Sequence, residues 1–530
     1  MKKHWLKGTV SIEPLLWNWY AWNQLIAPST AGAHLRKRYL KILQSYCVHP
    51  ALHEAASSDP KLIGGPYVAI DRSKMSAIET LIVRIFDEAK PLMELSEAID
   101  QVSGLLSHAS GFSLENFYEN IPDVLAGCVE LTYDMHHHAD IRLIEALLYR
   151  QYCSCQGQTI LLSQRPRSDR AFALSTPRFS QSDDVMLSLP FSSCVIDQLA
   201  QAQREPCCLD TISEVLALSA ELQQPFQNLF THLPPASAHT RYQNKGIRIR
   251  YFGHACILLE TKQTSILIDP LIGSHDCTQA RKHFSYLDLP DRIDYVLISH
   301  SHQDHFDLET LLHIRWQVKN IVLPDNHQGF LADPSLKLIA QALGFKSIIT
   351  LREMETIQAT DLCITALPFL GEHGDLNIHS KLAYHIQLDN RSFLFAVDSN
   401  NLDVRLYKKI VHWMRSIDVL FVGMECNGAP YSWTYGPLFQ KAIQREYDQS
   451  RRLNGSDSEK VWQMIQVLQC TEVYIYAMGQ EPWLRSIMGL HCDENSKQMI
   501  EAQVLMQRCQ NAGIKTEKLF YSAQWSYGFS

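Results

Sequence analysis

Histidines and acids crowd the end of one apolar run. The segment IDYVLISHSHQDHFD, residues 293–307, begins as a hydrophobic strand and then breaks into His300, His302, Asp304 and His305. In an extended chain alternate side chains share a face, so His300 and His302 can converge on one metal ion. Asp304 and His305 follow after a turn and can face a second ion. Because these side chains are costly to bury unless they bind something, the segment predicts a two-metal site rather than a His-rich surface loop.

The elements that must position this site are short apolar runs with helical patterns between them. The runs are rich in Val, Ile, Leu, Tyr and Phe and are bounded by turn residues, as strands are. They lie at 247–252, 255–260, 265–269, 295–299, 320–323, 381–388, 393–397, 419–422 and 473–476. Helical patterns occupy 307–317 and 460–469. Paired sheets with helices outside would satisfy this order.

A proline-containing polar stretch, LPPASAHTRYQNKG at 233–246, separates this half from the one before it. We predict two domains, 1–238 and 239–530. The first is predicted as a mixed α+β domain, hypothesised to serve in dimerisation or carrier docking. Apolar residues at helical spacing mark 76–105, 113–133 and 210–230, and a β-like run lies at 159–162.

Composition narrows the function classes. The chain has 530 residues, 46% of them hydrophobic, and a formal net charge of −8. That charge argues weakly against a nucleic-acid partner, because duplex binding usually needs a basic stripe. The 14 cysteines are scattered without zinc-knuckle spacing. No stretch approaches the length and apolarity of a membrane span. We therefore predict reduced thiols, no membrane segment and a cytoplasmic location.

The motif HSHQDH matches the HxHxDH signature of the metallo-β-lactamase superfamily. The upstream run YFGHACILLETKQTSILIDPLIG also resembles that family's first hairpin, including its Asp269–Pro270 turn. This resemblance implies an αββα sandwich and further ligands downstream. A carboxylate, Glu372, stands in LPFLGEHGD where the family has a histidine, and Asp398 in SFLFAVDSN fits the bridging acid. The run VYIYAMGQEPW, where a last histidine is usual, has none before His491.

The resemblance thus implies a carboxylate-rich pair of metal sites. One metal would be held by His300, His302 and Glu372, the other by Asp304 and His305, and Asp398 would lie between them. Carboxylate and imidazole together suit iron. With the N-terminal domain and the aromatic opening WNWYAWNQLIAPSTAG at 17–32, the pattern resembles the di-iron β-hydroxylases of non-ribosomal peptide assembly lines over almost the whole chain.

This resemblance implies a function. The enzyme would be an O₂-dependent monooxygenase with two non-haem iron ions, oxo- or hydroxo-bridged. It would β-hydroxylate an amino acid tethered as a thioester to a peptidyl carrier domain, and it would be a homodimer. Glu372 is the ligand expected to move when substrate binds. Electrons would come from an external donor, because the sequence shows neither a Gly-rich dinucleotide loop after a strand nor a four-cysteine cluster.

Two other function classes compete with this one. A dinuclear zinc hydrolase of the same fold, thioesterase- or lactonase-like, would use metal-bound hydroxide, with His373 or His379 in place of Glu372 as a ligand. Glu372 favours iron, whereas a histidine in its place would favour zinc. A carrier-binding scaffold with a vestigial site is the other class, and the apparently complete set of six ligands argues against it.

Several other patterns allow a structural interpretation as well as a functional one. His254 is interpreted as a hydrogen-bonded structural residue, and 135–138 (MHHH) as a structural or surface segment that binds no metal. The loop 429–433 either lines a substrate pocket or packs ordinarily. The basic run 35–41 is either a docking face for an acidic carrier domain or a solvated helix face. Aromatic residues predicted for the core or a subunit interface are Trp17, Trp19, Tyr20 and Trp22.

Overall fold

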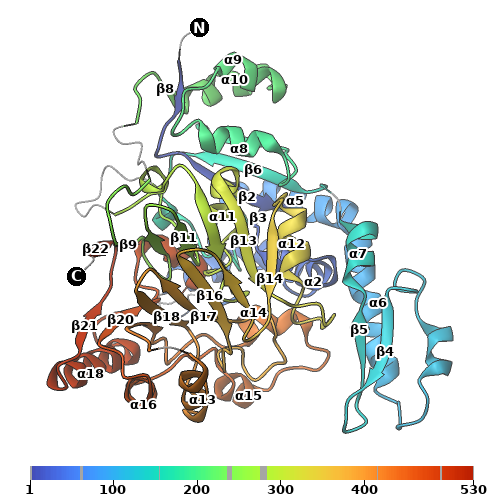
Figure 1. Ribbon diagram of the computed structural model, residues 1–530. Coiled ribbons are helices and arrows are strands. Elements are labelled where there is room, and N and C mark those ends of the chain that lie inside the picture. Colours follow the sequence, from blue (N-terminus) through green and yellow to red (C-terminus); the bar gives the residue numbers. More distant parts are fainter. Residues whose placement is uncertain are drawn as a thin grey trace.

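Two seven-stranded sheets stack face to face in the C-terminal half of the computed structural model (Figure 1). The model describes residues 3–59, 62, 64–153, 155–235, 241–274, 283–414, 416–489 and 492–528. Among these, the strands of the first sheet run in the order β14-β13-β12-β11-β10-β9-β22. They are β9 (Ile247–Tyr251), β10 (Ile257–Glu260), β11 (Ser265–Ile268), β12 (Ile293–Leu297), β13 (Val318–Pro324), β14 (Ile348–Leu351) and β22 (Ala523–Tyr527).

The second sheet runs β15-β16-β17-β18-β19-β20-β21. Its strands are β15 (Thr356–Gln358), β16 (Leu362–Leu367), β17 (Ala383–Leu388), β18 (Arg391–Val397), β19 (Val419–Gly423), β20 (Glu472–Tyr476) and β21 (Lys515–Lys518). One apolar core fills the space between the sheets, with Leu297 and Ile249 from the first and Phe395 and Tyr474 from the second. Both sheets therefore bury their facing sides against each other.

Helices cover the outer faces of this sandwich (Figure 1). Residues of α13 (Arg405–Trp413), α16 (Ser458–Leu468) and α18 (Lys497–Asn511) share a core with the outer side of the second sheet. On the first sheet lie α11 (Leu308–Ile314) and α12 (Leu336–Ala342). Shorter helical segments are η6 (Tyr286–Asp288), η7 (Arg315–Gln317), α14 (Ser432–Tyr435), η8 (Gly436–Leu438), α15 (Arg445–Ser450), η9 (Pro482–Leu484) and α17 (Arg485–Met488). The predicted αββα sandwich is confirmed, and each predicted strand overlaps an observed one.

The N-terminal half is a mixed α+β region built on a four-stranded sheet of order β3-β2-β6-β7. Its strands are β1 (Trp5–Leu6), β2 (Ser11–Leu16), β3 (Trp19–Tyr20), β4 (Val129–Tyr133), β5 (Ala139–Leu143), β6 (Gln158–Ser163), β7 (Val185–Leu187) and β8 (Phe230–Thr231). Its helical segments are α1 (Asn23–Ile26), α2 (Pro28–His34), η1 (Leu35–Tyr39), α3 (Leu40–Val48), α4 (Pro50–Ser57), η3 (Arg72–Lys74), α5 (Met75–Glu88), α6 (Lys90–Leu106), η4 (Glu115–Asn120), α7 (Glu145–Tyr152), η5 (Arg167–Asp169), α8 (Cys194–Gln201), α9 (Leu209–Val215) and α10 (Ala220–Asn228).

One continuous apolar core joins the two halves. It includes Trp19 and Leu162 from the N-terminal sheet together with Leu258, Val296 and Leu311 from the sandwich and its helix α11. A shared core of this kind holds the N-terminal region rigidly against the first sheet. The predicted boundary between 238 and 239 lies outside the described residues, and the division into 1–238 and 239–530 stays a proposal.

The prediction of a helix over 113–133 is wrong. The segment forms the short 3₁₀ helix η4 and then strand β4, which pairs with β5 in an antiparallel hairpin. Pro122 and Gly127 interrupt the helical pattern, and Gly127 adopts a positive φ of 74°. Proline and glycine both disfavour a helix interior, so the apolar spacing alone was misleading.

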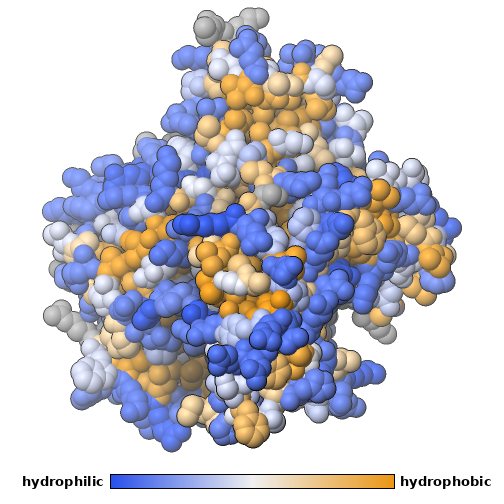
Figure 2. Space-filling view, turned by 90° about the vertical axis from the view of Figure 1, so that its right-hand side faces the viewer, coloured by the Kyte–Doolittle hydropathy of each residue, from blue (hydrophilic) through white to orange (hydrophobic). Residues whose placement is uncertain are grey.

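The β4–β5 hairpin projects from the body of the molecule beside α6 and α7 (Figure 1). Seen from that side, apolar patches alternate with hydrophilic areas (Figure 2). Large apolar side chains exposed in this part of the chain are Phe112, Tyr118, Met135 and Leu147. Across the described residues, no helix combines the length and apolarity needed to cross a membrane.

Candidate metal centre

The candidate ligands all follow the carboxyl ends of strands. The cluster His300–His305 follows β12, Glu372 follows β16 by five residues, and Asp398 comes directly after β18. These strands belong to both sheets, so the loops meet along one edge of the sandwich. The structure thus brings together all six residues that the sequence predicted.

Distances between the side chains define three overlapping groups. Asp398 Oδ2 lies 2.9 Å from His305 Nε2, and Glu372 Oε1 lies 2.7 Å from His302 Nδ1. His300 Nε2 lies 3.6 Å from the other oxygen of Glu372. Sets of ligand atoms within 4.8 Å of one another are His300 with His302 and Glu372, His300 with His305 and Asp398, and His254 with Asp304 and His305.

Three of these buried ligand atoms have no hydrogen-bond partner among the described residues. They are His300 Nε2, Glu372 Oε2 and Asp398 Oδ1. A buried imidazole nitrogen or carboxylate oxygen without a partner is costly unless it coordinates an ion. The donor set of carboxylates and imidazoles is one that iron accepts. The residues present therefore fit a pair of iron ions.

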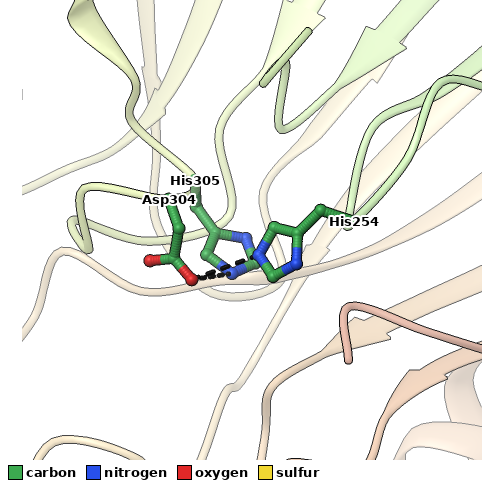
Figure 3. A group of neighbouring side chains, drawn as sticks. All are labelled: His254, Asp304 and His305. Atoms are coloured by element: carbon green, nitrogen blue, oxygen red, sulfur yellow. Dashed lines mark hydrogen bonds and ion pairs between the residues drawn. The ribbon is translucent and has the colours of Figure 1, made fainter. Parts of the chain in front are cut away.

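His254 belongs to this site, although the sequence pattern favoured a structural role for it. Its ring and that of His305 both face the carboxylate of Asp304 (Figure 3). His254 Nε2 lies 3.1 Å from Asp304 Oδ2, and His305 Nε2 lies 3.6 Å from the same oxygen. His254 is thus hydrogen-bonded, as expected. Its fully buried ring also makes it a candidate ligand that supplies a fourth imidazole.

The site is braced by Asp269, at the turn that follows β11. One oxygen of Asp269 accepts from the Ser299 hydroxyl and faces His305 Nδ1 at 3.0 Å, and the other accepts from the Ser299 backbone N–H. These contacts orient His305 so that its Nε2 points at Asp398. Positive φ angles at Asp269 (42°), His254 (51°) and Glu372 (67°) show that the backbone is strained where the site needs it.

Glu425 is a carboxylate of the site that sequence reasoning missed. It follows β19 and lines a cavity of about 70 Å³ together with His302, Asp304, Glu372 and Asp398. Burial, and then the negative charge of Asp398, raise the pKa of Glu425 well above its usual range. Its position two residues beyond an apolar strand was the available signal, and it matches that of the other acids.

The N-terminal region reaches the metal loop through buried polar contacts. The Asn23 amide donates to the Ser301 carbonyl, and the Tyr20 hydroxyl donates to Asp307. Arg167 forms two hydrogen bonds with the same carboxylate, at 2.7 and 3.0 Å. The loop that carries His300–His305 is therefore held from both halves of the molecule.

The chain is similar to known proteins over both of its halves. A family model described as the diiron non-heme beta-hydroxylase N-terminal domain matches residues 5–234, and a beta-lactamase superfamily domain matches residues 264–431. A relative from Streptomyces venezuelae, 4-amino-L-phenylalanyl-[CmlP-peptidyl-carrier-protein] 3-hydroxylase, is 34% identical over 522 residues, which are 97% of this chain and 98% of the relative. The chain belongs to the di-iron β-hydroxylase family.

Solved structures agree with this assignment. The crystal structure of CmlA, a diiron β-hydroxylase from Streptomyces venezuelae, matches with a TM-score of 0.93 and 32% identity, covering 99% of this chain and 100% of that chain. A mutant of CmlA matches with a TM-score of 0.91. The predicted resemblance, the di-iron cofactor and the oxygenase class are thus confirmed, and the zinc hydrolase is not favoured.

The other residues singled out in the sequence of this β-hydroxylase lie partly beside the metal centre and partly on the surface. His373 is buried, with Nδ1 at 3.1 Å from Glu372 Oε2, whereas His379 is exposed. The segment 135–138 forms the exposed turn of the β4–β5 hairpin, as predicted. The opening aromatics Trp17, Trp19, Tyr20 and Trp22 are buried, as predicted. The run VYIYAMGQEPW ends before His491, which lies outside the described residues.

Replacement of Asn23 by alanine in this β-hydroxylase is expected to loosen the metal loop. The buried Ser301 carbonyl would lose its donor, at a cost of about 1–3 kcal/mol in stability. Loss of a group that orients metal ligands typically weakens metal binding by about 10–100-fold. Iron affinity, measured by competition with a chelator, should fall while the exposed control Asn116→Ala keeps it. Unchanged affinity in Asn23→Ala would show that the contact does not position the loop.

Iron binding by the metal-free β-hydroxylase is expected to weaken in acid. Burial raises the pKa of Glu372 to about 7. Below that pH the carboxyl group holds a proton that must leave before the oxygen can coordinate a metal, so protonation opposes binding. Anaerobic titrations with Fe(II) between about pH 6 and 8 would measure how the logarithm of the iron affinity rises with pH. This slope, which counts the protons released on binding, should be lower by about one in Glu372→Gln. An identical slope in both proteins would contradict this role.

Proposed function

We propose that this chain β-hydroxylates an amino acid carried as a thioester by a peptidyl carrier domain of a non-ribosomal peptide synthetase. The observation that carries the proposal is the buried group of Glu372 with His300 and His302, in which a carboxylate replaces a third imidazole. The name of the relative from Streptomyces venezuelae supports the substrate class, because that protein acts on an aminoacyl carrier protein.

We assign the ligands as the sequence predicted and add one candidate. His300, His302 and Glu372 would hold one iron ion, Asp304 and His305 the other, and Asp398 would bridge them, with His254 as a further ligand beside Asp304. The two ions, when bound, supply the chemistry that activates O₂ for insertion into a C–H bond. Glu372 is the ligand proposed to move when substrate binds, since its Oε2 forms no hydrogen bond with the described residues.

The remaining side chains shape the space where the substrate would react. Trp22, Leu174, Trp433 and Met488 line the 70 Å³ cavity together with the proposed metal ligands. Such an apolar wall would hold the substrate side chain and exclude bulk water. Glu425 lies among the ligands and, with its raised pKa, would hold a proton at its carboxyl group.

The reaction needs reducing equivalents from outside the chain. One C–H bond, O₂, two electrons and two protons give one C–OH group and one water. We therefore propose an external electron donor as a partner.

The test is hydroxylation by iron-loaded full-length protein. Protein with two irons per chain is reduced, exposed to O₂ and mixed with aminoacyl carrier domains, and mass spectrometry follows the tethered amino acid. A gain of one oxygen atom on the amino acid, with the thioester intact, is expected. Release of the free amino acid without added oxygen would instead identify a thioesterase and overturn the proposal.

We also propose a homodimer in the cytoplasm. The exposed apolar side chains near the β4–β5 hairpin, with Phe112 80% and Met135 93% exposed, support a subunit contact there. Thirteen cysteines in the described parts of the chain form no disulfide bond, which suits a reducing compartment. Light scattering of the protein before and after Met135→Lys would test the contact.

A further inference from the structure

A second, larger cavity lies next to the metal centre. It has a volume of about 790 Å³, within the range of small-molecule sites. Its walls come from the basic run 35–41, from residues 64–67 and from the loop around α14 and η8. The N-terminal and C-terminal halves thus form this cavity together.

The described walls of this cavity carry positive charge. Lys37, Arg38, Lys41 and Lys441 line it, and no Asp or Glu is among the described residues that line it. Lys37 is paired with Asp100 at 2.7 Å. The other three cations form no ion pair with any residue that the structure describes. An enclosure of this kind favours an anion.

Arg38 is held in place and still has an unused donor. Its Nη2 donates to the Ser432 carbonyl at 2.9 Å, while its buried Nη1 has no hydrogen-bond partner among the described residues. A buried guanidinium nitrogen without an acceptor is costly. An anionic oxygen bound in the cavity would satisfy it, and guanidinium groups pair well with phosphate oxygens.

The cavity adjoins the metal centre through shared residues. Leu174 and Trp433 line both this cavity and the 70 Å³ cavity that contains His302, Glu372 and Asp398. A bound molecule with a charged group among the basic residues could therefore extend past Trp433 toward the residues of the metal centre. Carrier domains present such a molecule: a long, flexible arm with a phosphodiester at its base and the aminoacyl thioester at its tip.

We propose that this cavity binds the phosphopantetheine arm of the carrier domain, with Arg38, Lys41 and Lys441 receiving the phosphate and Trp433 lining the passage of the thioester to the metal centre. The inference rests on the proposed function and names the substrate-binding subsite that it requires. The basic run 35–41 then recognises the phosphate of the arm, in addition to any contact it makes with the carrier surface.

Affinity for the arm without its amino acid tests the subsite separately from catalysis. Calorimetry on the iron-loaded full-length protein compares phosphopantetheine, pantetheine and inorganic phosphate. Charge-assisted bonds to the phosphate should make phosphopantetheine bind about 10–100-fold more tightly than pantetheine. The Lys41→Ala/Lys441→Ala variant should lose this preference for phosphopantetheine over pantetheine. The control Lys408→Ala/Lys409→Ala, which removes the same charge from exposed positions on α13, should keep it.

Three outcomes would overturn the subsite: equal or undetectable binding of the two thiols, a preference that persists in Lys41→Ala/Lys441→Ala, or inorganic phosphate binding as tightly as phosphopantetheine. Kinetics with aminoacyl carrier domains separate this failure from that of the proposed function. If the protein hydroxylates and the KM for the carrier domain is the same in both double variants, the subsite alone is wrong. If phosphopantetheine binds more tightly than pantetheine but no hydroxylation occurs, the proposed function is wrong and the subsite remains supported. Support for both is a raised KM with unchanged kcat in Lys41→Ala/Lys441→Ala only.

Discussion

Replacement of His305 by alanine is expected to cost most of the bound iron and to reduce hydroxylation by at least about a hundredfold. His305 is the one residue that takes part in both the group with Asp304 and His254 and the group with Asp398, as far as the described residues show. Its removal takes an imidazole from both groups. It also leaves Asp269, fully buried, without a partner that it faces at 3.0 Å.

Metal analysis and product formation would be measured on the same preparation. His305→Ala should bind clearly fewer irons than the wild type, and added Fe(II) should not restore its rate. The control is His136→Ala, on the exposed turn between β4 and β5, which should retain full iron and full rate. Normal iron content in His305→Ala would remove His305 from the ligand set.

Loss of Arg167 is expected to destabilise the protein by about 3–5 kcal/mol, the usual cost of breaking a buried ion pair from one side. The Arg167 side chain is 2% exposed and Asp307 is fully buried. Arg167 also lies near Glu309, which Arg170 holds at 2.6 Å. In Arg167→Ala the Asp307 carboxylate would stay buried with only the Tyr20 hydroxyl and its own helix start as partners.

Urea unfolding at neutral pH would measure this loss, and Arg405→Ala would serve as the control. Arg405 pairs with Asp403 at 2.7 Å on the surface, where removal of one partner should leave the unfolding midpoint unchanged. Because Asp307 precedes α11 directly after the metal loop, iron content should fall together with stability. An Arg167→Ala protein as stable as the wild type would show that the buried pair is dispensable.

The same pair predicts how the loss depends on pH. Although burial opposes it, the charge of Arg167 lowers the pKa of Asp307 below its usual range. A group with a lowered pKa in the folded state stabilises the fold above its unfolded pKa and ceases to do so as the pH falls through the folded value. The difference between wild type and Arg167→Ala should therefore be largest near neutral pH and shrink in strong acid. A constant difference would point to packing rather than charge.

The sequence by itself determined the metal loop and most of the sandwich. His300, His302, Asp304 and His305 lie within six residues, so their convergence depends only on local backbone geometry. The strands were predictable because the alternation and apolarity of short runs reflect burial between two sheets. Glu372 and Asp398 were placed by resemblance, since their distance in sequence says nothing about their distance in space.

Only the tertiary structure decided which distant residues complete the site. His254, Glu425 and Asn23 come from separate segments in both halves of the chain. Of these three, only Glu425, two residues beyond an apolar strand, carries a local signal. The cavity walled by Lys41 and Lys441 likewise exists because residues 400 positions apart pack together. Periodicity reports which face of an element is buried, whereas the pairing of elements is set by the whole core, and the site is built where those elements meet.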